Sequence, residues 1–139
     1  MLTQIQKQFI SKIPEDTIAA IKPWDPKAAE YARLLVQKIE KNLGLQTFWE
    51  GSLSLRIAGE NDIDLYIFSE PNDFDKYLPD LVTILGEPTY RLAEKILWRI
   101  KKDGHKIDAS LASKDSPEVK LDMFFYTSLK KTNTTKRIC

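Results

Sequence analysis

The chain is poor in the residues that form disulfides and bind soft metals. Its 139 residues include one cysteine, Cys139, and one histidine, His105. A single thiol cannot form an internal disulfide, and this pair is too small to supply the ligands of a structural zinc site. We therefore do not expect a disulfide-stapled domain or zinc chemistry, and the scarcity of cysteine suits a reducing cytoplasm.

Long apolar runs and bulk charge are also missing. No stretch approaches 18 consecutive apolar residues, and the N-terminal MLTQIQKQFISKI lacks the apolar core of a signal peptide. We expect a cytoplasmic protein with no membrane partner. The 21 basic and 20 acidic residues give a net charge of +1, so any binding of a polyanion has to be local.

What remains is the composition of one globular domain, with 42% hydrophobic and 29% charged residues and no internal repeat. Helical spacing, capping residues and strand patterns divide residues 1–139 into four parts. The parts are N-terminal helices (1–44), a core of strands (45–112), a C-terminal helix (116–130) and a polar tail (131–139) that we expect to fray.

The order of elements predicts an α+β fold. Asp25, Pro26 and Gly44 delimit the clearest helix, and two shorter helices precede it. Strands are predicted at 45–50 and 61–68, a helix bent or restarted at Pro79, and a hairpin turning at Asp103-Gly104. These elements form one small mixed sheet with helices mainly on one face, which leaves the other face partly open for a site.

The pattern that carries chemistry is a pair of like charges on a predicted strand. Asp62 and Asp64 in NDIDLYIF share one face, and Asp108 in HKIDASL faces the same way from a neighbouring strand. Three converging carboxylates repel one another unless a cation lies between them. Two Mg²⁺ or Mn²⁺ ions suit such hard oxygen ligands and promote phosphoryl or nucleotidyl transfer.

Gly51-Ser52 lies upstream of this pair and predicts a phosphate site. Glycine allows the backbone to approach a phosphate closely, and the serine hydroxyl adds a donor. SLSLRIA is predicted to begin with a helical turn or two, whose free amides favour an anion. Arg56 is then within reach of the same phosphates.

These motifs resemble the signature of the nucleotidyltransferase fold, the DNA polymerase β superfamily, over residues 45–112. The resemblance implies that Gly51 and Ser52 bind a nucleoside triphosphate, and that Asp62, Asp64 and Asp108 hold two metal ions. It also implies transfer of a nucleoside monophosphate to a hydroxyl or other acceptor, with Asp108 as metal ligand, general base or both. Arg56 would neutralise charge on the leaving pyrophosphate.

Within that superfamily the chain most resembles the GrpB-like (UPF0157-type) proteins, in WEGSLSLRIAGENDIDLYIF and in SPEVKLDMFFYTSLKK. Those relatives commonly have an apolar residue at the position of Asp62 and often a histidine at that of Asp108. They also continue into another helix where this chain ends in KKTNTTKRIC. Because this chain has all three acids, its sequence supports a metal-binding site. The same differences weaken the transfer of properties that are specific to the GrpB-like proteins.

Simpler interpretations remain open. The acids can be solvated residues of an exposed strand, and Ser52 can be a helix cap. The KKDGHK segment (101–106) can be a solvated hairpin tip or a weak basic clamp for phosphate or RNA. Trp24, Trp49, Phe124 and Phe125 are expected in the core, and Trp98 or Tyr66 on the open face beside a base. A catalytically silent nucleotide- or RNA-binding module is the alternative function. The acceptor (small molecule, RNA or protein), the preferred base and the oligomeric state stay undetermined.

Overall fold

The computed structural model describes the backbone of residues 22–138 and the side chains of residues 22–131. The two short helices predicted before residue 22, and Cys139, lie outside the described residues.

Five strands form one mixed sheet in the order β1-β2-β5-β4-β3. The central pair, β2 and β5, is parallel, while the other neighbours are antiparallel. Asp103 and Gly104, with φ of 53° and 80°, form the predicted tight turn between β4 and β5. The sequence did not predict the two-residue edge strand β3. The strands are β1 (Thr47–Glu50), β2 (Ile63–Phe68), β3 (Tyr90–Arg91), β4 (Lys95–Lys102) and β5 (His105–Ala112).

Two helices cover one face of this sheet. Helix α3 (Pro26–Leu43) begins where the Asp25 side chain accepts a hydrogen bond from the amide of Lys27, and it ends at Gly44 with φ of 71°. A 3-10 turn, η1 (Pro71–Asp73), leads into helix α4 (Phe74–Leu85), which continues through Pro79 as one element. The restart that the sequence predicts at Pro79 is absent, because apolar residues on both sides of the proline anchor the same face of α4 in the core.

The core lies between these helices and one side of the sheet. Alternate residues of the two central strands point into it: Ile63, Leu65 and Ile67 from β2, and Ile107, Ala109 and Leu111 from β5. Trp98 of β4 is fully buried here and donates its indole N–H to the carbonyl oxygen of Gly86 at 2.8 Å. Trp98 is therefore a core residue, and the prediction that it lies on the open face is wrong.

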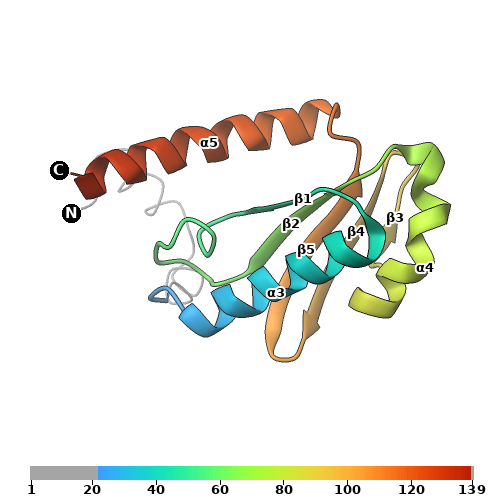
Figure 1. Ribbon diagram of the computed structural model, residues 1–139, viewed down its shortest axis with the longest axis horizontal. Coiled ribbons are helices and arrows are strands. Elements are labelled where there is room, and N and C mark those ends of the chain that lie inside the picture. Colours follow the sequence, from blue (N-terminus) through green and yellow to red (C-terminus); the bar gives the residue numbers. More distant parts are fainter. Residues whose placement is uncertain (1–21, 139) are drawn as a thin grey trace.

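Helix α5 (Pro117–Ile138) runs along the opposite side of the sheet, as Figure 1 shows. It packs through Val119 and Met123 against a small cluster that includes Tyr66 and Phe68, and the Tyr66 hydroxyl donates to the carboxylate of Asp122. The predicted end of this helix at residue 130 is wrong, because α5 includes residues 131–138 of the predicted tail. No proline or glycine follows to stop the helix, so it continues to Ile138.

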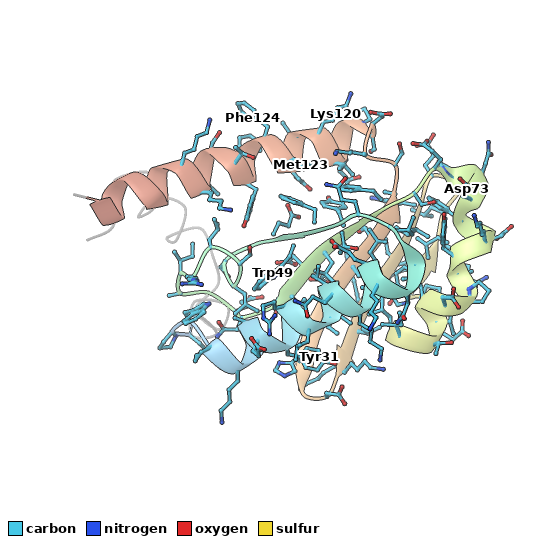
Figure 2. The ribbon with its side chains drawn as sticks, viewed as in Figure 1. Tyr31, Trp49, Asp73, Lys120, Met123 and Phe124 are labelled. Carbon is cyan, nitrogen blue, oxygen red and sulfur yellow. The ribbon has the colours of Figure 1, made fainter. Side chains whose placement is uncertain are left out.

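Phe124 and Phe125 lie on the outer side of α5 and are 66% and 56% exposed. In Figure 2 the side chain of Phe124 points away from the sheet while that of Met123 points toward it. The prediction of these two phenylalanines as core residues is wrong, because the helix buries only the narrow stripe that includes Val119 and Met123.

The α+β class with one small mixed sheet is confirmed, with α3 and α4 on one face and α5 across part of the other. The uncovered part of that second face carries the charged residues of β1, β2, β4 and β5. Within residues 22–138 no helix has the length and apolar character needed to cross a lipid bilayer.

Candidate nucleotide and metal site

One row of charged residues crosses the open face perpendicular to the strands. Glu50 of β1 pairs in register with Asp64 of β2, Asp64 pairs with Asp108 of β5, and Asp108 pairs with Arg99 of β4. Residues paired across strands point to the same face, so three carboxylates and one guanidinium lie side by side. The parallel register between β2 and β5 therefore brings Asp64 and Asp108 together as the sequence predicted.

This row lies in a cleft of about 920 Å³, whose other walls are the β4–β5 hairpin and the segment before β2. Asp62 lies one residue before the first residue of β2 and also lines the cleft. The charged residues of its lining are Lys22, Asp25, Glu50, Glu60, Asp62, Asp64, Lys95, Arg99, Lys101, Lys106, Asp108 and Glu118.

Gly51 is in close contact with Asp64. Its φ of 91° lies in the left-handed region, and a β-carbon built on it would lie 2.2 Å from Oδ2 of Asp64. Any side chain here would displace the carboxylate. Of the predicted phosphate-binding residues, Gly51 is the one in direct contact with the acidic row.

The backbone after Gly51 makes a tight turn. The amide of Leu55 donates to the carbonyl oxygen of Gly51 at 3.1 Å, and that of Ile57 donates to Ser52 at 3.1 Å. Within the described residues, the amides of residues 52–54 donate to no protein acceptor. Consecutive unpaired amides of this kind form a small anion-binding concavity. The Ser52 hydroxyl is directed at the loop itself, because a β-carbon on Gly59 would lie 2.2 Å from its Oγ.

The predicted helix over SLSLRIA does not form beyond this one turn. Arg56 has φ of 59°, a left-handed conformation that ends the turn and redirects its side chain. The guanidinium of Arg56 lies over the Trp24 ring, 5.8 Å from its centroid, and Arg56 does not line the cleft. The structure thus does not bring Arg56 together with the acidic row.

Burial and neighbouring negative charges raise two pKa values in the row. Burial, followed by the neighbouring charges of Asp108, Asp62 and Glu50, raises the pKa of Asp64 to about 7. Burial and then the charge of Asp122 raise the pKa of Glu50 to about 7. Both raised pKa values indicate that the carboxylates of Glu50 and Asp64 lack compensating positive charge in the folded protein.

Lys106 of β5 partly supplies that charge. Its Nζ lies 3.5 Å from Oδ2 of Asp62 and 4.0 Å from the Glu60 carboxylate. Burial nonetheless raises the pKa of Asp62, against the lowering effect of Lys106, while Asp62 raises the pKa of Lys106. Within the described chain, no three His, Cys, Asp or Glu side chains are grouped closely enough to form a complete metal-ligand set.

Sequence reasoning missed two contributors to the site, Glu50 and Gly59, and considered Lys106 only as part of the KKDGHK hairpin tip. Glu50 ends a predicted strand immediately before Gly51, which places it beside the phosphate motif. Lys106 shares the two-residue alternation of Asp108 and so faces the same side of β5. Gly59 carries no local sequence signal, because its need for a small residue comes from its contact with Ser52.

Comparison with known proteins identifies no family. No family model matches the chain, and no curated protein matches it, so nothing supports the GrpB-like family specifically. Among solved structures, the chain is similar to polymerase beta from Leishmania infantum in a ternary P/T complex, with 18% identity and a TM-score of 0.45. That match covers 79% of this chain and spans about half of the other, 54%.

Proposed function

We propose that the cleft binds a nucleoside triphosphate together with Mg²⁺ or Mn²⁺ and transfers its nucleoside monophosphate to an acceptor. The observation that supports this most is the contact between Gly51 and Asp64. It joins a turn with free amides to a row of carboxylates in a single cleft. A triphosphate and divalent cations require these two elements side by side.

The donor chemistry suits hard cations, although among the described residues no three acidic side chains are grouped closely enough to form a complete ligand set. Asp62, Asp64 and Asp108 supply carboxylate oxygens, and the raised pKa values of the row indicate that the folded protein favours added positive charge there. Bound ions would neutralise charge on the reacting phosphates. The amides after Gly51 hold the triphosphate, and Asp108 accepts the proton of the acceptor hydroxyl.

The experiment that tests this function is thermal unfolding with each of the four nucleoside triphosphates, with and without Mg²⁺. Preferential binding to the folded state at 100 times Kd stabilises by about 2.7 kcal/mol, or several degrees for a chain of this size. We expect a rise in Tm that needs both nucleotide and metal and that is absent in Asp64→Asn. A chain that shows no rise under any condition does not have this function.

A catalytically silent binding module of the same fold is the second candidate. The ion pair between Lys106 and Asp62 favours it, because the lysine already occupies one of the carboxylates that metal would need. Pyrophosphate release separates the two candidates. A silent module binds Mg²⁺ and nucleotide yet releases no pyrophosphate with small-molecule, RNA or protein acceptors. Kinship with the GrpB-like proteins and a cytoplasmic location are further parts of our proposal.

A further inference from the structure

The β4–β5 hairpin places cations directly beside the acidic row. Arg99 of β4 is the register partner of Asp108, and Lys101 is the register partner of Lys106 on the same face. All three cations line the cleft. Like charges directly opposite each other on a sheet repel, and in the part of the chain that the structure describes only Lys106 of the pair Lys101–Lys106 has carboxylate partners.

Two of these cations are not engaged by the protein. Lys106 is held by Asp62 and Glu60. Among the described residues, no carboxylate oxygen lies within 4 Å of the charged groups of Arg99 and Lys101. Arg99 is exposed, and the hydrogen bond that fixes it, to Thr89, involves its backbone amide. Its guanidinium is therefore available to a ligand in the cleft.

The position of these cations distinguishes them from the proposed triphosphate site. The Gly51 turn borders the row at the β1–β2 side, where it contacts Asp64, whereas Arg99 and Lys101 lie on the β4 side, beyond Asp108. A nucleotide held by the turn and an anion held by β4 thus approach the carboxylates from opposite sides.

We infer that the acceptor bears a phosphate group and that Arg99 and Lys101 bind this phosphate beside Asp108. The inference rests on the proposed function, because it takes Asp108 as the base that faces the acceptor. A planar guanidinium matches two phosphate oxygens, and a lysine ammonium adds a point charge, which is a common pairing for phosphate recognition.

The reaction places these groups in defined roles. The acceptor hydroxyl oxygen forms a bond to the α-phosphorus of the nucleotide, and the bond from that phosphorus to the bridging oxygen of pyrophosphate breaks. The hydroxyl proton passes to Asp108, and pyrophosphate leaves with the bonding electron pair. The phosphate already on the acceptor stays intact, and Arg99 and Lys101 hold it in place.

The test measures binding of phosphate-bearing probes to the full chain in the presence of Mg²⁺ and α,β-methylene-ATP, an analogue that cannot transfer. Ribose 5-phosphate represents a small phosphorylated acceptor, a five-residue oligouridylate represents a nucleic-acid end, and ribose is the neutral control. The variant is Arg99→Gln/Lys101→Gln. The matched control, Lys38→Gln/Lys41→Gln, removes the same charge from exposed positions of α3 outside the cleft.

We expect wild type and the α3 control to bind at least one phosphorylated probe and not ribose. Arg99→Gln/Lys101→Gln should weaken that binding roughly tenfold or more, since each cation contributes a charge-assisted hydrogen bond. Its affinity for the nucleotide analogue should stay unchanged. Binding of ribose 5-phosphate identifies a small acceptor, and binding of the oligouridylate alone identifies a strand end.

Two results would overturn the inference. If neither phosphorylated probe binds better than ribose, β4 carries no phosphate site. If the double variant loses the nucleotide analogue instead of the probe, Arg99 and Lys101 belong to the triphosphate site. A wild-type chain that fails to bind the analogue rejects the proposed function itself and with it the acceptor role. The same titration without nucleotide then shows separately whether the cations bind phosphate.

Discussion

Gly51 packs directly against the carboxylate of Asp64, so closely that a β-carbon on Gly51 would lie 2.2 Å from Oδ2. Glycine is therefore required at this position for two reasons. Its left-handed backbone, with φ of 91°, disfavours other residues, and the neighbouring carboxylate leaves no volume for a side chain. The turn that follows and the acidic row are thus held together by one contact.

Gly51→Ala tests this contact. We expect it to lower the free energy of unfolding by about 3 kcal/mol, from the left-handed backbone and from overpacking against Asp64. Gly44→Ala is the control, because Gly44 has φ of 71° with no atom within 4 Å of a β-carbon. It should cost about 1 kcal/mol by the backbone effect alone. Urea unfolding measures both, and equal losses would show that the contact with Asp64 is unimportant.

Asp64→Asn removes one charge from the row. In metal-free buffer at pH 8 we expect it to stabilise the protein, on the order of 1–2 kcal/mol, because the cost of burying the charge and the repulsion from neighbouring carboxylates are both relieved. Asp80→Asn, at an exposed position of α4, should change the stability by less than about 0.5 kcal/mol. Thermal unfolding at pH 8 compares the two variants. A destabilised Asp64→Asn would show that this carboxylate is satisfied by interactions within the protein.

Glu50 contributes to the pH dependence of stability, as Asp64 does. The pKa of Glu50 is raised from 4.5 to about 7 in the folded protein, so the folded chain keeps a proton that the unfolded chain releases. This contribution is fully present below pH 4.5 and is lost as the pH rises through 7. In metal-free buffer Glu50→Gln should therefore reduce the fall in stability between pH 5 and pH 8.

Chemical denaturation across that pH range provides the measurement. Glu87→Gln, which changes an exposed residue outside the cleft, should leave the pH profile as in wild type. An unchanged profile for Glu50→Gln would mean that Glu50 is ionised as easily in the folded chain as in the unfolded one.

Tyr66→Phe tests how α5 is held on the sheet. The Tyr66 hydroxyl donates to Asp122, and its loss leaves the carboxylate of Asp122 without this donor. We expect destabilisation of about 1–2 kcal/mol, as for other hydrogen bonds to charged groups. Tyr90→Phe, at a position that is 53% exposed, should be within about 0.5 kcal/mol of wild type. Urea unfolding of the two variants measures the difference. Similar midpoints would show that the hydrogen bond from Tyr66 to Asp122 does not stabilise the fold.

The sequence predicts those parts of the fold that local chemistry determines. Asp25 and Gly44 delimit α3 correctly, and Asp103-Gly104 marks the hairpin turn. Phe124 and Phe125 mislead, because the apolar character of a residue in a helix does not indicate whether a second layer covers it. That depends on how far the sheet extends beneath α5, which no short segment encodes.

The candidate site also combines features that the local sequence predicts with features that only the fold determines. Asp62 and Asp64 lie two residues apart in the sequence, and their spacing from Gly51-Ser52 is recognisable as a motif. The partnership of Asp64 with Glu50 appears only through the register of β1 and β2, which the sequence does not specify. Arg56 shows the opposite error, since one left-handed residue was enough to turn a favourably spaced cation toward Trp24.

The parallel pairing of β2 with β5 has a consequence for the order of folding. Asp64 and Asp108 are far apart in the chain, whereas β4 and β5 are joined by a two-residue turn, so the hairpin can close early and the central pair only late. Electrostatic repulsion therefore opposes the closing step of sheet assembly. A divalent cation that binds the row would favour this pairing of β2 with β5. Without metal, the pairing step would be slower, and refolding of the chain would be slower with it.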